Sequence, residues 1–447
     1  MTLHDSSSEA GHAIPPTTYP LERFTLPNGL RVVLAPDSSA PVVGVAVVYD
    51  VGIRSEPEGR TGFAHLFEHL MFQGSENLEK LAHFRYVQAS GGTFNGSTHL
   101  DYTDYYEMLP SNALERALFL EADRMRSPRI TEENLANQIE VVKQEIRVNV
   151  LNRPYGGFPW LKLPPVMFDT FPNAHDGYGS FEDLESATVD DAADFFARYY
   201  APGNAVLAIA GDLDVTEATR LVERHFGGIA GRPVPVRPDF DEPDLTAERR
   251  SSYPDTYAPL PAIASAWRVP DPIGDLTSYL PYVVLAEVLT DGDAARLQQR
   301  LVLQDRTATG VGGYIGFMGE PFEVRDPTAL LLQAHLPPDG DSDKVLATVD
   351  EELERLVTDG LDDGELERVV ARIGTHLLRE VDSVLGRTLQ MAVVEQQRGA
   401  DGSGAALVND LPRLIGEVTA AQVVAAAAAL TPQRRASVEV IPQGASE

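Results

Sequence analysis

One run of five residues, His65-Leu-Phe-Glu68-His69, carries the side chains best suited to chemistry in this sequence. On a helix, His65 and His69 are four residues apart and share one face, so both imidazoles can reach the same ion. Glu68 projects close to that face and could take a proton from a water molecule there without being a ligand. Two histidines and one carboxylate form the usual hydrolytic zinc site, so a further carboxylate must come from elsewhere in the chain.

A simpler interpretation of this run is an exposed helix whose histidines bind nothing. For a bare pair of histidines at helical spacing, that interpretation would be preferred. The full H-x-x-E-H pattern is rarer, and it is the inverse of the common H-E-x-x-H zinc motif. The pattern therefore predicts a metal-dependent hydrolytic site.

The sequence around the motif predicts the elements that must position it. Asn28-Gly29 is a turn signal, and the apolar runs 30–36 and 42–51 that follow are expected to form a hairpin pair. Helical periodicity and glycine breaks predict the next elements. The expected helices cover 62–72, 112–126 and 132–148, and a polar strand is expected over 93–101.

Two distant parts of the chain repeat one pattern, a capped helix followed by a proline break and an apolar strand. Thr188 begins one such helix and Thr419 the other, about 230 residues later, and in each the side chain three positions on could complete a capping box. The strands that follow cover 205–210 and 436–441. The repeat predicts that the chain is a duplication of one ancestral domain.

Four longer segments resemble the M16 peptidases, the pitrilysin and insulinase group, and especially its short branch with the mitochondrial processing peptidases. They resemble, in order, the family's metal helix, its substrate-pairing strand, the helix with its third ligand and the end of its first domain. The segments are Gly62–Ser75, Gly91–Thr98 with Asp101, Thr103 and Tyr105, Asn137–Glu145, and Tyr199–Asp212. The likeness is strong from about residue 20 to 215 and diffuse beyond.

This resemblance implies an α+β fold of two homologous domains, each a mixed, mostly antiparallel sheet packed with helices. A flexible tail is expected over 1–19 and a zinc-binding peptidase domain over 20–230. The segment 231–261 is rich in Pro, Asp and Arg and is expected to be a linker. A homologous domain without a metal site should then fill 262–447.

The same resemblance implies Glu145 as the third metal ligand, because it follows His69 by 76 residues in a Val-Val-x-x-Glu context. Glu140 is the alternative, but it lies five residues earlier, about 140° round the helix, so both cannot face the ion. Gln138 stands where the family often has a second Glu. It can bind a ligand but cannot act as a base.

In the second half, the positions aligned with the metal site carry other residues. Val283, Ala286 and Glu287 stand opposite the motif, and His376 stands opposite Glu145. A lone histidine is more often structural than a ligand. We therefore expect one Zn²⁺ per chain, in the first domain.

The resemblance further implies a zinc-dependent endopeptidase acting on extended, unfolded peptides, in leader-peptide processing or peptide turnover, with Glu68 as catalytic base. Phe72, Asn95 and Gly96 are the expected substrate contacts in the first domain. An edge strand there would add a peptide through main-chain hydrogen bonds. The alternative function is a non-catalytic scaffold subunit of a heterodimer in this family.

A partner subunit is also expected. In the family, a second unit supplies an Arg and a Tyr near the zinc, and Arg296 lies in a segment that resembles the Arg-bearing one. The Tyr is expected where 308–310 reads Ala-Thr-Gly, and Tyr314 is displaced along the strand. A homologous, zinc-free subunit would complete the site in a heterodimer; a homodimer is the alternative.

Composition limits the remaining possibilities. The formal net charge of −31 argues against nucleic acid or an anionic membrane as partner, although acidity can also serve solubility alone. The chain has no cysteine, so a transition metal must be held by His and carboxylate. No apolar run is long enough to span a membrane, and residues 1–16 do not resemble a secretory signal, which favours the cytoplasm.

Overall fold

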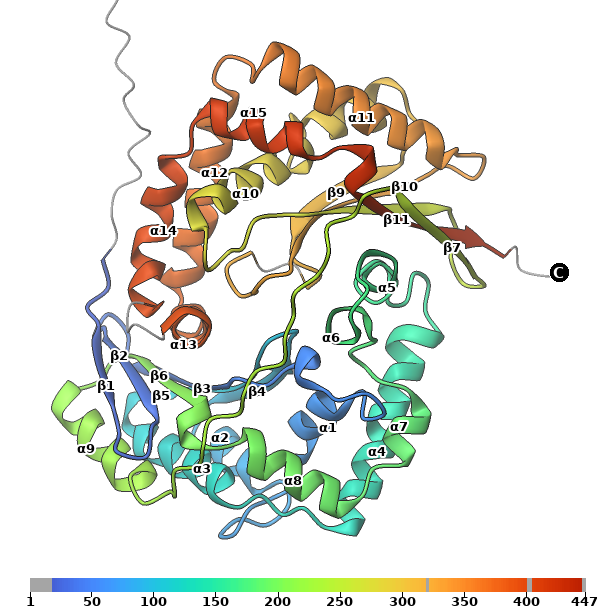
Figure 1. Ribbon diagram of the computed structural model, residues 1–447. Coiled ribbons are helices and arrows are strands. Elements are labelled where there is room, and N and C mark those ends of the chain that lie inside the picture. The colour runs from blue at the N-terminus through green and yellow to red at the C-terminus, as the bar shows by residue number, and fades with distance from the viewer. Residues whose placement is uncertain (1–17, 319–320, 400–403, 444–447) are drawn as a thin grey trace, which may run out of the picture.

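The computed structural model describes residues 18–318, 321–399 and 404–443. Two β-sheets face one another across the middle of the molecule, and helices cover their outer faces (Figure 1). Helices α5 (Pro164–Met167), α6 (Phe171–Ala174) and α13 (Val384–Arg398) lie between the sheets. Among the described residues no helix is both long enough and apolar enough to cross a membrane.

The first sheet has six strands in the order β1-β2-β6-β3-β5-β4, in which only β2 and β6 run parallel. Its central strands, with sequences VVGVAVVY and AVLAIAG, are apolar throughout because both faces of the sheet are covered. β4 lies at the edge and, among the described residues, pairs only with β5. The bounds are β1 Glu22–Thr25, β2 Arg31–Pro36, β3 Val42–Tyr49, β4 Thr93–Thr98, β5 Thr103–Pro110 and β6 Ala205–Gly211.

The second sheet repeats this topology. Its order is β7-β11-β8-β10-β9. If β1 is set aside, each sheet has a set of five strands, β2 to β6 and β7 to β11. Numbered in chain order within its set, each sheet has the spatial order 1-5-2-4-3, and strands 1 and 5 run parallel. Only β1 has no counterpart. The bounds are β7 Arg249–Asp255, β8 Ala262–Arg268, β9 Gly310–Ile315, β10 Ala329–His335 and β11 Arg435–Pro442. An identical strand order in both halves is strong physical support for duplication.

The remaining helices follow the same division. Those of the first half are α1 Phe63–Leu70, α2 Ala82–Ala89, α3 Leu114–Arg126, α4 Glu132–Ile146, α7 Phe181–Glu185, α8 Val189–Tyr199 and α9 Val215–Phe226. Those of the second half are α10 Leu276–Thr290, α11 Ser342–Asp359, α12 Glu365–Asp382, α14 Leu407–Gly416 and α15 Ala420–Ala429. The expected fold class, α+β with two homologous domains of mixed, mostly antiparallel sheet, is confirmed.

Short sequence patterns predicted two helix starts correctly and the first hairpin wrongly. Thr188 and Thr419 each form the expected capping box, at the start of α8 and α15. The expected hairpin of 30–36 with 42–51 is wrong: β6 lies between β2 and β3, and the turn at Asn28-Gly29 instead joins β1 to β2. The apolar β6 can bury both of its faces only at the centre of the sheet.

The two halves are joined by more than the chain that connects them. Residues 230–248 cross from one to the other without helix or strand, and β7 lies within the range expected as linker. Helix α13 comes from the second half of the sequence but packs on β3 and β6 of the first sheet. Most of the tail expected over 1–19 lies outside the described residues, and Tyr19 exchanges two hydrogen bonds with Asn409. The domain boundaries drawn from the sequence stay a prediction.

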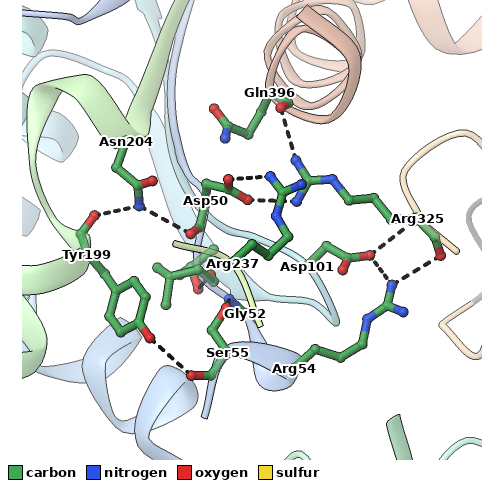
Figure 2. Close-up of polar contacts among 12 residues, drawn as sticks. Asp50, Gly52, Arg54, Ser55, Asp101, Tyr199, Asn204, Arg237, Arg325 and Gln396 are labelled. Atoms are coloured by element: carbon green, nitrogen blue, oxygen red, sulfur yellow. Dashed lines mark hydrogen bonds and ion pairs between the residues drawn. The ribbon is translucent and has the colours of Figure 1, made fainter. Parts of the chain in front are cut away.

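A buried polar network fastens the halves together at the centre of the interface (Figure 2). The Arg54 guanidinium donates to Asp101 Oδ2 at 2.5 Å, and both side chains are buried. The backbone N–H of Arg325, from the second half, donates to the same oxygen at 3.0 Å. One carboxylate oxygen thereby links two segments of the first half to the second.

Arg325 also binds through its side chain. Its guanidinium donates to Asp50 Oδ1 at 2.7 Å and to the carbonyl oxygen of Gln396 in α13 at 3.1 Å. Arg237, from the connecting segment, donates to the other Asp50 oxygen at 2.5 Å (Figure 2). The sheet, the connection and α13 therefore share one charge network.

The ionisation of Asp101 depends on this network. Burial alone would raise the pKa of Asp101, but the charges of Arg54 and Arg325 outweigh burial and hold the pKa below its usual range. A carboxyl whose folded pKa is lowered stabilises the fold above its unfolded pKa and loses that contribution as the pH falls through the folded value.

We predict that Asp101→Asn lowers the free energy of unfolding by about 3–5 kcal/mol, because it leaves the buried Arg54 charge without its partner. Urea unfolding at pH 7 measures the change. Glu217→Gln is the control: it breaks an exposed pair with Arg220, and its effect should stay below about 1 kcal/mol. Equal effects of the two substitutions would contradict the role given to Asp101.

Candidate metal centre

Helix α1 carries the motif, and a buried carboxylate fixes its first turn. Gly62 precedes the helix at φ +84°, and the N–H groups of Gly62 and Ala64 donate to Glu56 at 2.9 and 2.7 Å. His175 Nε2 lies 3.1 Å from the same carboxylate. A negative charge at a helix N-terminus is stabilising. The start of the helix is therefore set by Glu56, which in turn is held by His175.

Three predicted ligands converge at one point. His65 Nε2 and His69 Nε2 lie 3.3 Å apart, as the four-residue spacing on α1 requires. Helix α4 packs beside α1 and brings Glu145 to them, with Oε1 at 3.6 Å from His65 Nε2 and Oε2 at 3.4 Å from His69 Nε2. The alternative ligand Glu140 points elsewhere and binds Lys143 at 2.7 Å.

This donor set fits a small divalent cation. Four ligands arranged tetrahedrally at roughly 2.0–2.2 Å from zinc are roughly 3.3–3.6 Å from one another. The three separations here lie in that range, with Glu145 facing each histidine through a different oxygen. Burial and the neighbouring His69 lower the pKa of His65 to about 4, so its imidazole is neutral and offers a lone pair. Two imidazole nitrogens that lie this close to each other and to a carboxylate would be stabilised by a bound cation.

Glu68 lies beside the ligands and faces the edge strand. Thr98 Oγ1 on β4 donates to Glu68 Oε2 at 2.7 Å. Burial raises the pKa of Glu68, an effect that the Thr98 hydrogen bond partly offsets. A carboxylate of raised pKa, next to a metal site and not ligating, is suited to accept and return a proton.

Two other predicted residues lie on the same strand. Asn95 is exposed on β4, and Gly96 is buried where β4 passes Glu68. A Cβ at Gly96 would come within 3.3 Å of Glu68 Cγ and 3.1 Å of the Tyr105 ring. The glycine therefore allows the strand to lie this close to the acidic side chain.

Phe72 and Arg296 are not part of the cluster. The Phe72 ring packs 5.3 Å from Phe84 and 5.9 Å from Phe94, in an aromatic group beside β4. Arg296, in the second half, donates to Glu365 at 2.7 and 3.0 Å and does not approach the three ligands. These packing and hydrogen-bond contacts do not test whether Phe72 and Arg296 contact substrate, so those roles stay predictions.

Sequence reasoning missed Tyr178, Thr98 and the pairing of Glu56 with His175. Tyr178 Oη lies 3.3 Å from Glu145 Oε1, and its ring lies 5.1 Å from the ring of His65. The loop that carries it has no periodic pattern, and only its two flanking glycines mark it as unusual.

Comparison with known proteins agrees with this geometry. Residues 31–154 match the family model described as Insulinase (Peptidase family M16), and residues 186–373 match the model described as Peptidase M16 inactive domain. Together the two models cover more than half of the chain. The chain belongs to the M16 peptidase family.

Individual relatives are more distant. The chain is 29% identical over 292 residues to the zinc protease PqqE of Helicobacter pylori, which covers 64% of this chain and 65% of that protein. It is 30% identical over 206 residues to subunit 1 of the mitochondrial cytochrome b-c1 complex of Bos taurus, covering 46% of this chain and 42% of that protein. The matches thus span less than two thirds of these relatives' length.

A solved structure extends the likeness over the whole fold. A protease from Helicobacter pylori superposes with a TM-score of 0.86 at 23% identity, covering 95% of this chain and 100% of that chain. At this identity the superposition shows a shared fold.

The second M16 domain has no metal cluster among the described residues. Its aligned residues Val283, Ala286, Glu287 and His376 do line one cavity, beneath the edge strand β9. His376 there lies 3.3 Å from Glu380, one turn further along α12. The ligand residues differ between the domains while the surrounding elements match.

The first domain contains a second group with metal-like composition. His83, Glu107 and Glu121 are fully buried, and His83 Nε2 lies 3.0 Å from Glu107 Oε1 and 4.0 Å from Glu121 Oε1. Arg124 already binds Glu121, with its Nε donating at 2.8 Å. A divalent cation added to this arginine and two carboxylates would leave a net positive charge in the core, which argues against a metal here.

A proton explains this group better. Burial raises the pKa of both Glu107 and Glu121 to about 7, and Arg124 favours the charged form of Glu121. With Glu107 protonated and His83 neutral, the group has no net charge. We therefore expect Glu107 to hold the proton.

We predict that Glu107→Gln changes the free energy of unfolding by less than about 1 kcal/mol at pH 5, because the amide resembles a protonated carboxyl. Glu121→Gln should cost about 3–5 kcal/mol, since it leaves Arg124 buried without its partner. Urea unfolding of both variants measures the difference. Equal losses of stability in the two variants would contradict the assignment of the proton to Glu107 and of the negative charge to Glu121.

The pH dependence adds a check on the same pair. A carboxyl with a raised folded pKa stabilises the fold at low pH and loses that contribution as the pH rises towards about 7. Glutamine does not ionise, so Glu107→Gln should gain stability relative to the wild type across that window.

Proposed function

We propose that this chain is a zinc-dependent endopeptidase that hydrolyses extended, unfolded peptides, in leader-peptide processing or in peptide turnover. One observation carries the proposal: three ligand atoms from α1 and α4 converge within 4.8 Å of one another. Glu68 lies on α1 with the two histidines, close enough to His69 and Glu145 for their charges to act on its pKa. His65, His69 and Glu145 would hold one Zn²⁺. The zinc proteases among the relatives support the choice of metal.

A bound zinc would supply Lewis acidity to the scissile carbonyl and acidify a water molecule. The residues of the chain do the rest. Glu68 accepts the proton of the attacking water and passes it to the leaving amine. Its burial and the Thr98 hydrogen bond hold the carboxylate in place between the ligands and the substrate strand.

The edge strand β4 is the proposed substrate platform. Because β5 is the one strand that pairs with β4 in the described part of the chain, the outer edge of β4 would present free main-chain donors and acceptors to an extended peptide. Asn95 is exposed on this strand and would add a side-chain contact, and Gly96 keeps the peptide close to Glu68. Phe72 would line an apolar subsite nearby. Recognition through the main chain favours unfolded substrates over folded ones.

The alternative is a non-catalytic M16 subunit. Subunit 1 of the b-c1 complex, among the relatives, is named for an assembly and not for proteolysis. A scaffold subunit needs neither the three ligands nor the base, and this chain has the residue types proposed for all four roles. Their joint presence favours the enzyme.

We predict that Glu68→Gln retains zinc but lowers peptide hydrolysis by about 10²–10⁴-fold, because an amide cannot accept the proton. Glu145→Gln should lose zinc, and Glu140→Gln, on an exposed face of the same helix, should keep both zinc and activity. Metal analysis and cleavage of a quenched peptide measure these effects. Hydrolysis by Glu68→Gln at the wild-type rate would remove Glu68 from the mechanism.

We also propose a partner subunit, a homologous zinc-free M16 chain in a heterodimer, with a homodimer as the alternative. Arg296 would serve the partner's site, as the family resemblance suggests, although in this chain it is held by Glu365. Residues 308–310 lack the expected tyrosine, and Tyr314 is part of the wall of the second-domain cavity. The cytoplasmic location inferred from composition stays a prediction.

We predict that the purified chain alone hydrolyses peptides weakly and that a co-encoded homologous subunit stimulates it. The expected reason is that the missing tyrosine must come from another chain. Mass measurement in solution, with hydrolysis assayed before and after adding the homologue, tests this. A fully active isolated chain would rule out the heterodimer.

A further inference from the structure

Tyr178 lies directly against two of the three proposed metal ligands. Its hydroxyl donates to Glu145 Oε1 at 3.3 Å. Its ring and the His65 ring pack edge to face, at a centroid distance of 5.1 Å and an interplanar angle of 76°. No step of the proposed reaction uses this side chain.

The backbone around Tyr178 is fitted against the start of the metal helix. A Cβ at Gly62 would lie 2.5 Å from the Tyr178 carbonyl oxygen, and a Cβ at Gly179 would collide with the Thr61 carbonyl. Both glycines have positive φ, at +84° and +81°, where a side chain is strained. Only glycine at both positions allows the loop to approach this closely.

Side-chain contacts hold the loop in that position. Ser180 N–H donates to Thr61 Oγ1 at 3.1 Å, and Thr61 N–H donates to Asp183 Oδ2 at 3.0 Å. On the other side of the loop, His175 binds Glu56, which caps α1. The loop is thus tied to the metal helix at both of its ends.

His65 needs such a neighbour. Metal-ligating histidines usually donate their second ring nitrogen to a carboxylate or carbonyl, which fixes the ring orientation. His65 Nδ1 is buried, and no described residue accepts a hydrogen bond from it. The Tyr178 ring therefore provides a packing contact for a ring that lacks the usual hydrogen bond.

Glu145 needs one as well. Its side chain is 29% exposed, so burial alone does not fix the carboxylate. An oxygen has two lone pairs, so Oε1 can accept the Tyr178 hydrogen bond and still face His65. The hydroxyl thereby selects one orientation of the carboxylate, in which Oε2 faces His69 at 3.4 Å.

We infer that Tyr178 is a positioning residue for the metal site: its hydroxyl orients Glu145 and its ring orients His65 towards a divalent cation. This inference depends on the proposed zinc site. It assigns to Tyr178 a contribution to metal affinity that does not require the residue to touch substrate.

The test compares Tyr178→Phe with the wild type by zinc titration against a chromogenic chelator. Loss of an outer contact to a metal ligand typically weakens metal binding by about 10–100-fold, and we expect a loss in that range. Tyr178→Ala, which also removes the ring, should weaken binding further. Tyr86→Phe is the control, because Tyr86 is exposed on α2, and its zinc affinity should equal that of the wild type.

Two further measurements separate positioning from other roles. The metal-free thermal midpoint of Tyr178→Phe should match the wild type, since the ring and its packing remain. At saturating zinc, kcat for a quenched peptide should recover towards the wild-type value. Wild-type zinc affinity in Tyr178→Phe, or a low kcat that saturating zinc does not restore, would overturn the inference and leave the proposed enzyme intact. A wild type that binds no zinc would overturn both.

Discussion

The buried carboxylate of Asp101 ties the two halves of the molecule to the metal helix. It accepts hydrogen bonds from the Arg54 side chain and from the Arg325 backbone, so the second half is fixed to the segment just before α1. Two residues after Arg54, Glu56 caps that helix. A charge this deeply buried is tolerable only while both partners stay in place. The geometry of the ligands therefore depends on contacts well outside the site.

Duplication explains why the site sits at one edge of a sheet. In each half the third strand of the set is at the edge, next to the helix that follows the second strand. Central strands use their main-chain donors and acceptors in pairing on both sides. An edge strand keeps one row of these groups free to bind a peptide. Ligands on the helix beside that edge would lie next to a peptide that adds to the edge strand.

The sequence predicted most of what is local and little of what depends on distant contacts. Spacing on one helix was enough to bring His65 and His69 together, and helix caps at Thr188 and Thr419 were read correctly from three-residue patterns. The insertion of β6 between β2 and β3 was not predictable from neighbours in sequence, because strand pairing depends on which strand can bury both faces. Tyr178 was missed for a related reason. Close packing at two glycines brings it to the ligands, and no periodic pattern in the sequence marks its position.

The second domain shows what the proposed metal site would cost the fold. Two imidazoles and a carboxylate pointing at one another gain little unless a cation binds, so the arrangement is a local sacrifice of stability. At the aligned positions of α10, Val283 and Ala286 replace the first histidine and the base, and both are buried in the apolar core. The sheet and its edge strand persist there without ligands. Because the fold does not need the metal residues, their joint presence in the first domain is best explained by selection for chemistry.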